Sequence, residues 1–159
     1  MIHIRNPATV VILLTVIFSG LLASDEMIIR ESVRQYTLGI ITASKKDSVE
    51  HLEPYATEKR AQKLMIWMKS WHENNYFMDS AIEKFAVESV KQHGKKATVK
   101  TRERWRYRYI QIVTKQVTQP WTQADYMMKY DLVKIGPHWK VDEAKILSEK
   151  ETPLEKPRK

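Results

Sequence analysis

The hydrophobic residues that follow Asp25 recur at the spacing of an α-helix, with charged residues filling the positions between them. This pattern predicts an amphipathic helix that packs its apolar side against a core. The apolar positions are Ile29, Val33, Tyr36 and Ile40. The polar stretch at residues 43–47 interrupts the pattern, so the sequence predicts a break in the helix there.

Two more helices are expected before the pattern changes. A short helix is predicted over Ser48–Glu53, because Pro54 disfavours helical geometry in the residue before it. A longer helix is predicted from about Thr57 to His72, where apolar residues return at helical spacing. Core packing is the simplest interpretation of its large apolar residues, which are Met65, Met68 and Trp71.

Beyond Tyr76 and Phe77 the hydrophobic period changes to two, which is typical of β-strands. Strands are predicted over Ile82–Val90, Ala97–Val113, Asp125–Ile135 and His138–Leu147. Helices followed by an antiparallel meander indicate an α+β fold, with the helices packed on one face of the sheet. We therefore expect one α+β domain over residues 25–147 and a disordered, charged tail at residues 148–159.

The strand predicted over residues 97–113 has two chemically different faces. One face carries aromatic and aliphatic residues around a single acid: Val99, Thr101, Glu103, Trp105, Tyr107 and Tyr109. The other carries five cations, which we call the basic row: Lys100, Arg102, Arg104, Arg106 and Arg108. Cations this close repel one another unless anions answer them. Two interpretations stay open: ion pairs with acids of neighbouring strands, such as Asp131 or Glu83, or docking onto an anionic partner.

Residues 1–23 have the layout of an export segment. Arg5 is their only strong positive charge, and residues 8–23 then run without any charge. This layout is typical of a signal peptide cleaved after Ala23, or of a signal anchor that stays in the membrane. A buried helix of a soluble domain is the third interpretation. Both export interpretations predict that the rest of the chain is periplasmic or otherwise extracytoplasmic, either secreted after cleavage or anchored by the N-terminal helix.

Composition narrows the possible chemistry. The 159 residues include 27 Lys and Arg against 19 Asp and Glu, which gives a formal net charge of +8. The sequence has no cysteine, which excludes disulfides, thiol catalysis and cysteine-bound metals. No pair of histidines has the spacing of metal ligands with a convincing third ligand, so we expect no metal and no cofactor. Nucleic acid is not an expected partner, because an exported protein rarely meets it and no nucleic-acid-binding motif is present.

The closing segment around Tyr126, Leu132 and Trp139 is similar to the last hairpin of the nuclear-transport-factor-like (NTF2-like), or cystatin-like, cone proteins. Within that superfamily, the chain most resembles the intermembrane-space (IMS) domain of plastid-division proteins and their cyanobacterial relatives. Residues Trp71–Phe77 and Phe85–Val90 carry this resemblance together with the closing hairpin. The resemblance implies a long helix in the hollow of a strongly bent antiparallel sheet.

We therefore expect a non-catalytic protein-interaction module of a cell-envelope complex. It would dock through the basic row, through sheet-mediated dimerisation that uses Ile110 and Ile112, or through both. The expected partner is an envelope protein or a second copy of the chain, with anionic lipid or an envelope polymer as further options.

The alternative is a small-ligand pocket, or an isomerase- or dehydratase-type enzyme, in the aromatic hollow of the cone. The candidate pocket residues are Trp71, Glu103, Trp105, Tyr107, Tyr109, Tyr126, Tyr130 and Trp139. Among these side chains, Glu103 is the candidate general base. The competing interpretation is that Glu103 lies near a strand bend or pairs with a nearby Lys or Arg, so we assign no catalytic residue.

Overall fold

The computed structural model describes the backbone of residues 7–154 and the side chains of residues 25–154. The elements are α1 Pro7–Lys46, the 3₁₀ turn η1 Glu50–Leu52, α2 Glu58–His72, β1 Tyr76–His93, β2 Lys96–Gln111, β3 Val117–Ile135 and β4 His138–Pro153. The side chains of the predicted signal peptide or anchor, residues 1–23, lie outside the described residues. Within the part that is described, no helix has a stretch long and apolar enough to cross a membrane.

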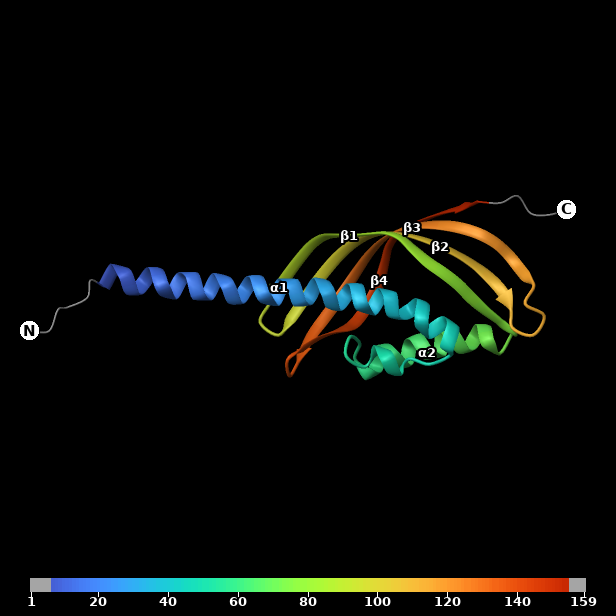
Figure 1. Cartoon of the computed structure of the whole chain (residues 1–159), viewed down its shortest axis with the longest axis horizontal. Coiled ribbons are helices and arrows are strands. Elements are labelled where there is room, and N and C mark those ends of the chain that lie inside the picture. The colour runs from blue at the N-terminus through green and yellow to red at the C-terminus, as the bar shows by residue number, and fades with distance from the viewer. Residues whose placement is uncertain (1–6, 155–159) are drawn as a thin grey trace, which may run out of the picture.

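The four strands form one antiparallel sheet in the order β1–β2–β3–β4. Figure 1 shows that the sheet curls over α1 and α2, which lie together on its concave side. Register shifts occur in all three strand pairs, for example between Ile82 and Lys84 of β1, and such bulges bend and twist a sheet locally. The predicted α+β fold, with helices packed on a strongly bent antiparallel sheet, is confirmed.

The helices agree with the sequence prediction at one end and differ at another. α2 begins as predicted because Thr57 caps it: Thr57 Oγ1 accepts a hydrogen bond from the Arg60 backbone N–H at 3.3 Å. α1 continues through the predicted break as far as Lys46. Ser44 is buried in this last turn, and its hydroxyl donates to the backbone oxygen of Met78 at 2.6 Å. Because β1 satisfies this polar side chain, the residue does not end the helix.

The last strand is longer than predicted. β4 continues past Leu147 to Pro153, so the tail expected from residue 148 is strand as far as residue 153. Residues 148–153 pair with residues 122–127 of β3. The charged composition of this segment suggested a tail. The hydrogen bonds between strands join backbone groups and need no apolar side chains, so the segment forms a strand in spite of its composition. Residues 155–159 lie outside the described part of the chain.

The hydrophobic core lies between the helices and the concave face of the sheet. Ile29, Val33 and Tyr36 of the predicted apolar helix face are completely buried in it. Opposite them lie buried side chains of the sheet, including Leu132 and Trp139. Burial of each large apolar side chain stabilises the fold by about 1.5–3 kcal/mol, so this half of the cone forms a rigid base.

One glycine permits a close contact between α1 and the η1 turn. A Cβ at Gly39 would overlap the side chain of Leu52, which is completely buried. The backbone oxygen of Gly39 also lies 2.8 Å from His51 Nε2. The absence of a side chain at this position therefore sets the distance between the two segments.

Candidate functional site

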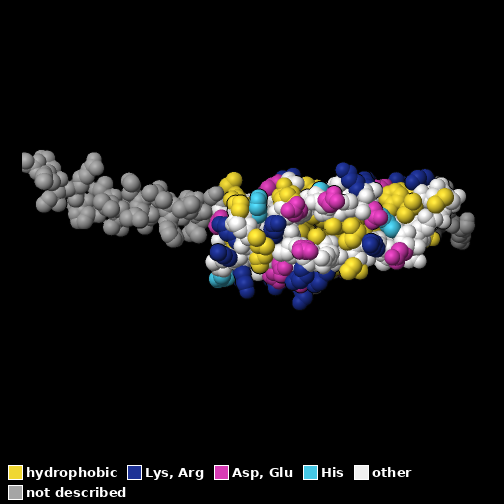
Figure 2. Space-filling view, turned by 90° about the horizontal axis from the view of Figure 1, so that it is seen from below, with side chains coloured by type: hydrophobic (Ala, Val, Ile, Leu, Met, Phe, Trp, Pro, Cys, Tyr) yellow, Lys and Arg dark blue, Asp and Glu magenta, His cyan; other side chains and the backbone are white. Residues whose placement is uncertain are grey.

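A pocket opens on the concave side of the sheet, beside α2; we call it the aromatic pocket. It has a volume of about 550 Å³, which lies within the roughly 300–1,000 Å³ typical of ligand sites. Its large walls are Trp67, Trp71, Trp105, Tyr107, Tyr109, Tyr126, Met128 and Ile146. Figure 2 views the molecule from the helix side and shows hydrophobic side chains gathered on this face.

The aromatic side chains of the pocket pack edge to face. Trp71 of α2 contacts Tyr109 of β2 with ring centroids 5.5 Å apart, and Tyr109 contacts Tyr107 at 5.8 Å. Trp67 precedes Trp71 by one helical turn, and the centroids of their rings lie 4.1 Å apart. Such contacts contribute roughly 0.5–1.5 kcal/mol each beyond burial, so they hold the walls in place. Trp67 is 44% exposed and stands at the mouth of the pocket.

Glu103 lies at the floor of the pocket and is only 2% exposed. Its Oε1 accepts hydrogen bonds from Thr101 Oγ1 at 2.6 Å and from the Tyr130 hydroxyl at 2.7 Å. Its Oε2 accepts one from Trp105 Nε1 at 2.7 Å. Three neutral donors thus hold this carboxylate, and no lysine or arginine among the described residues forms an ion pair with it. The competing interpretation of Glu103 was a strand bend or a pairing with Lys or Arg, and the described residues do not form that pair.

One of the donors to Glu103, the Tyr130 hydroxyl, is itself held in place by packing. Tyr130 is buried against Tyr36 of α1, with ring centroids 6.0 Å apart. Burial raises the pKa of the Tyr130 hydroxyl well above its usual value, and the adjacent Glu103 charge raises it further. The hydroxyl therefore stays protonated and remains a donor. The hydrogen bond from Tyr130 to Glu103 consequently links β3 to β2 beneath the aromatic walls.

Charged groups of opposite sign flank the pocket. They are Arg60 and Lys63 on α2, and Glu149 and Glu151 on β4. The Tyr107 hydroxyl donates a hydrogen bond to Glu151. Burial raises the pKa of Tyr126, and a hydrogen bond to Glu149 raises it further. The tyrosines of β2 and β3 therefore anchor the β4 side of the mouth with neutral hydroxyl groups.

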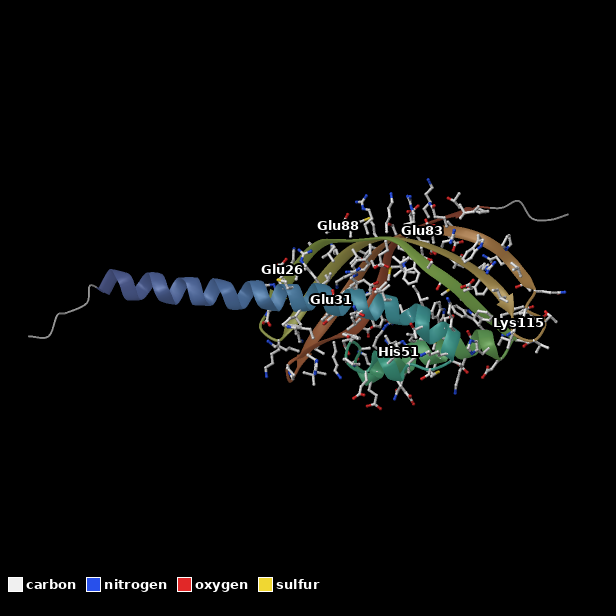
Figure 3. All side chains as sticks on the ribbon, viewed as in Figure 1. Glu26, Glu31, His51, Glu83, Glu88 and Lys115 are labelled. Atoms are coloured by element: carbon white, nitrogen blue, oxygen red, sulfur yellow. The ribbon has the colours of Figure 1, made fainter. Side chains whose placement is uncertain are left out.

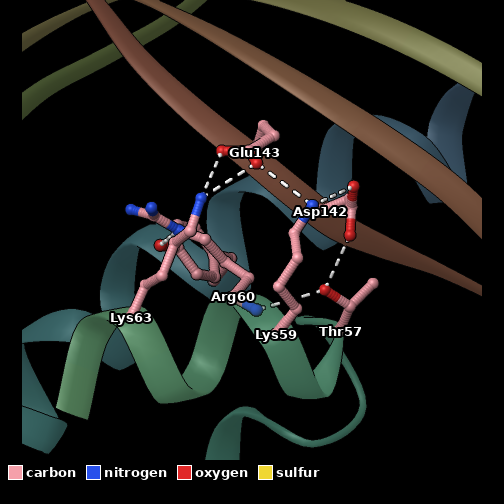
Figure 4. A network of polar contacts seen from close by, with 7 residues as sticks. Thr57, Lys59, Arg60, Lys63, Asp142 and Glu143 are labelled. Carbon is pink, nitrogen blue, oxygen red and sulfur yellow. Dashed lines mark hydrogen bonds and ion pairs between the residues drawn. The ribbon is translucent and has the colours of Figure 1, made fainter. Parts of the chain in front are cut away.

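A polar network joins the start of α2 to β4 at the side of the pocket (Figure 4). Thr57 Oγ1 donates to Asp142 at 2.9 Å, and Lys59 Nζ lies 3.0 Å from the same carboxylate. Glu143 accepts from Lys63 at 3.0 Å and from Lys59 at 3.1 Å. Lys63 and then Lys59 lower the pKa of the Glu143 carboxyl from 4.5 to about 2. These contacts fix the position of α2 relative to β4.

The basic row lies on the convex face of the sheet, opposite the pocket. Four of its members pair with carboxylates: Arg102 with Glu88 at 2.7 Å, Arg104 with Asp125 at 2.7 Å, Arg106 with Glu83 at 3.8 Å and Arg108 with Asp79 at 3.0 Å. Figure 3 shows Glu83 and Glu88 on this outer side, away from the helices. The expected partner Glu83 is thus present, whereas Asp131 pairs with Lys129 instead.

The guanidinium groups also cover an aromatic side chain. Trp121 of β3 lies under Arg106 and Arg108, with distances of 4.5 and 4.4 Å from the guanidinium carbons to the ring. Lys100 is exposed and is the member of the row for which the described residues provide no ion pair. The repulsion among these cations is therefore offset mainly by carboxylates and the Trp121 ring of the same sheet.

The structure brings seven of the eight predicted pocket residues together: Trp71, Glu103, Trp105, Tyr107, Tyr109, Tyr126 and Tyr130. The eighth, Trp139, does not line the pocket. It is completely buried in the core, where Lys134 lies 5.7 Å from its ring. Trp139 has the inward orientation that the alternation predicts, but its place near the β3–β4 turn puts it at the other end of the sheet.

Several lining residues were missed by the sequence analysis. Trp67 precedes Trp71 by four residues on a helix, so helical spacing alone places both on one face. Glu149 and Glu151 were missed because the strand β4 was predicted to end at Leu147. Ile146 lies inside that predicted strand, but it was not singled out as a lining residue.

A second hollow lies where α1 and α2 end. It has a volume of about 670 Å³, and Ile110 and Ile112 line it together with Phe77. His72 Nδ1 lies 2.9 Å from an oxygen of Asp47 at its edge. In the part of the chain that is described, no group of three His, Cys, Asp or Glu side chains could hold a metal ion.

The bent sheet with two helices in its hollow has the cone-shaped α+β architecture known as the NTF2-like fold. The intermembrane space region of the chloroplast protein ARC6 has this fold, with a TM-score of 0.64 at 16% identity over 74% of this chain and 92% of that one. A hexachlorocyclohexane dehydrochlorinase, LinA type 2, gives a TM-score of 0.51 at 8% identity over 85% and 98% of the two chains. A ketosteroid isomerase-like protein from Erwinia carotovora atroseptica gives 0.47 at 17% identity over 77% and 95%.

No protein-family model and no curated protein matches the sequence. At identities of 16% and 8%, the likeness to the ARC6 region and to the dehydrochlorinase establishes the fold alone. Because the cone fold occurs both in an intermembrane space region and in a dehydrochlorinase, the function has to be argued from the pocket.

Proposed function

We propose that this chain is a non-catalytic binding domain that holds an apolar segment of a partner protein in the aromatic pocket. The observation that carries the proposal is the locked carboxylate of Glu103 beneath rigid aromatic walls. A general base needs a lone pair within hydrogen-bond reach of the substrate. Three protein donors occupy most of the acceptor sites of the Glu103 carboxylate and hold it in place, which disfavours it as a general base, and no histidine lines the pocket.

The mouth of the pocket supports a protein as the occupant. Trp67 and Ile146 line the pocket and are 44% and 55% exposed. Exposed tryptophan beside a concave apolar site is typical of the few residues that carry most of the energy of a protein interface. The mouth also adjoins β4, an edge strand whose second edge has no neighbouring strand in the described sheet. An extended segment entering the pocket has backbone partners available there.

An extracytoplasmic location fits this proposal. The uncharged run at residues 8–23 favours export, and the structural neighbour ARC6 contributes an intermembrane space region. Docking through the basic row and sheet-mediated dimerisation remain predictions. The carboxylate partners of four arginines remove most of the electrostatic reason for the first of these.

Site-specific photo-crosslinking in cells tests the proposal. A benzophenone amino acid replaces either Trp67 at the mouth or Ile66, the next residue, which is 69% exposed and does not line the pocket. We expect a discrete protein adduct from position 67, no such adduct from position 66, and loss of the adduct when Trp71→Ala removes a pocket wall. Equal adducts from both positions, or an adduct that survives Trp71→Ala, would contradict the proposal.

A small apolar ligand is the second candidate, which the pocket volume of about 550 Å³ favours. Native mass spectrometry of the purified chain distinguishes the two. A co-purified small molecule that is lost on Trp71→Ala would favour the ligand over the protein segment.

A further inference from the structure

The two hairpin ends beside α1 form a surface that the proposed function does not use. The β1–β2 turn covers residues 93–96, and the β3–β4 turn covers residues 135–138. The backbone N–H of Lys134 donates to the backbone oxygen of Lys95 at 2.9 Å, so the two ends lie side by side. Figure 1 shows both hairpins at the same end of the sheet, next to α1. We call residues 91–96 and 134–140 the hairpin-tip surface.

The hairpin-tip surface is cationic and contains no acid. Residues 91–98 and 132–141 include no Asp or Glu. Its cations are Lys91, Lys95, Lys96, Lys134 and Lys140, and His93 and His138 are exposed beside them. Only Lys134 among these lysines has an ion-pair partner within residues 25–154. Within residues 25–154, the charge of the other four lysines is thus left unpaired, in contrast to the basic row, where four arginines have carboxylate partners.

Asp25 ties the hairpin-tip surface to α1. Lys134 Nζ lies 3.0 Å from Asp25 Oδ1, and Gln92 Nε2 donates to Asp25 Oδ2 at 3.2 Å. One carboxylate of the helix therefore holds both hairpins. On its N-terminal side, the same helix extends to Pro7 and includes the uncharged run at residues 8–23.

Apolar side chains are also exposed at this end. Met27 and Ile28 on α1 are 70% and 41% exposed, and Ile135 at the β3–β4 turn is 51% exposed. Unpaired lysines beside exposed aliphatic side chains are a combination that suits the interface of a bilayer. At the interface of a bilayer, the lysines meet lipid phosphates and the aliphatic groups leave water.

We propose that the hairpin-tip surface rests on a membrane that contains anionic lipid, with its lysines against the headgroup phosphates. An acidic protein would answer the same charges. The lipid surface is favoured because the uncharged run and the exposed Met27 and Ile28 lie on the helix that Asp25 joins to this surface. The contact is electrostatic and therefore weakens as salt shortens the range of the interaction.

A distance measurement on the full-length chain tests this proposal. The sequence has no cysteine, so a single substitution gives a unique labelling site. A fluorophore is attached at His93→Cys on the hairpin-tip surface, or at Val113→Cys, which is 75% exposed beyond the other end of β2. The labelled chain is added to preformed vesicles that carry a headgroup quencher, made of phosphatidylcholine alone or mixed with phosphatidylglycerol.

We expect quenching at position 93 that increases at least twofold with phosphatidylglycerol and is reversed by salt, with no change at position 113. The triple variant Lys91→Gln, Lys95→Gln, Lys96→Gln should lose this increase. The matched triple Lys69→Gln, Lys84→Gln, Lys115→Gln removes the same charge from other exposed positions and should retain it. Quenching at position 93 that ignores the anionic lipid, or equal losses in the two triples, would overturn the proposal.

Discussion

Replacing Glu103 with glutamine separates a structural carboxylate from a catalytic one. The substitution keeps the shape of the side chain but changes one acceptor into a donor. The amide oxygen can still accept from Thr101 and Tyr130, and the new NH₂ group then faces the Nε1–H of Trp105, which loses its acceptor. A hydrogen bond to a charged group contributes about 1.5–3 kcal/mol, and the neutral amide recovers part of this through its smaller desolvation cost.

We therefore expect Glu103→Gln to lower the free energy of unfolding by about 1–3 kcal/mol. Urea unfolding followed by tryptophan fluorescence measures this as a lower midpoint at unchanged slope. Glu83→Gln is the control, since its arginine lies 3.8 Å away on the exposed face and the loss should stay below about 0.5 kcal/mol. Catalytic carboxylates are often held at the expense of stability, so a Glu103→Gln protein as stable as the wild type, or more stable, would refute this reasoning.

Three further predictions concern the frame around the pocket. Gly39→Ala should cost about 1–3 kcal/mol in thermal or urea unfolding, because its methyl group overlaps the buried Leu52; an unchanged midpoint would contradict this. The pKa of Glu143 is lowered from 4.5 to about 2, so its contribution to stability is complete at neutral pH and is lost as the pH falls between these values. Lys63→Gln should flatten this acid dependence in unfolding curves measured from pH 6 to about 2. Arg104→Gln should leave the midpoint of urea unfolding nearly unchanged, because exposed ion pairs contribute little to stability; a large drop would show that the basic row stabilises the fold.

The sequence predicts the two faces of β2 because alternation needs only the assignment of a strand. Val99, Thr101 and Glu103 are buried, while Lys100 and Arg102 are exposed. The burial of Glu103 among aromatic residues therefore follows from parity. Its hydrogen-bond partners do not, since Tyr130 reaches it from β3 through a register that no local pattern encodes.

The partners of the basic row show the same limit. Arg104 lies directly opposite Asp125 and Arg108 directly opposite Asp79, so the register decides which acid answers which cation. That register contains bulges, and each bulge shifts the pairing by a residue. From the sequence, Glu83 and Asp131 were equally good candidates, but only Glu83 lies next to an arginine of the row.

The prediction of element ends failed where tertiary contacts satisfy polar groups. α1 continues through Ser44 because the hydroxyl finds a backbone oxygen on β1. β4 continues to Pro153 because β3 offers a free backbone edge, although the segment carries almost no apolar residues. In both cases the deciding partner is distant in sequence, and a local pattern cannot reveal it.

The pocket and the hairpin-tip surface occupy opposite ends of the same strands. Along β2, Lys96 lies at the turn, Val99 in the core, and Glu103 to Tyr109 in the pocket. The eleven residue steps from Lys96 to Tyr107 cover roughly 36 Å along the strand at the usual rise of a strand. If the tips rest on the membrane, the pocket is held well beyond the headgroups, where a lipid chain of that membrane cannot reach it. The membrane contact would therefore favour an occupant presented by another protein, and the crosslink from position 67 should be to protein whether or not anionic lipid is present.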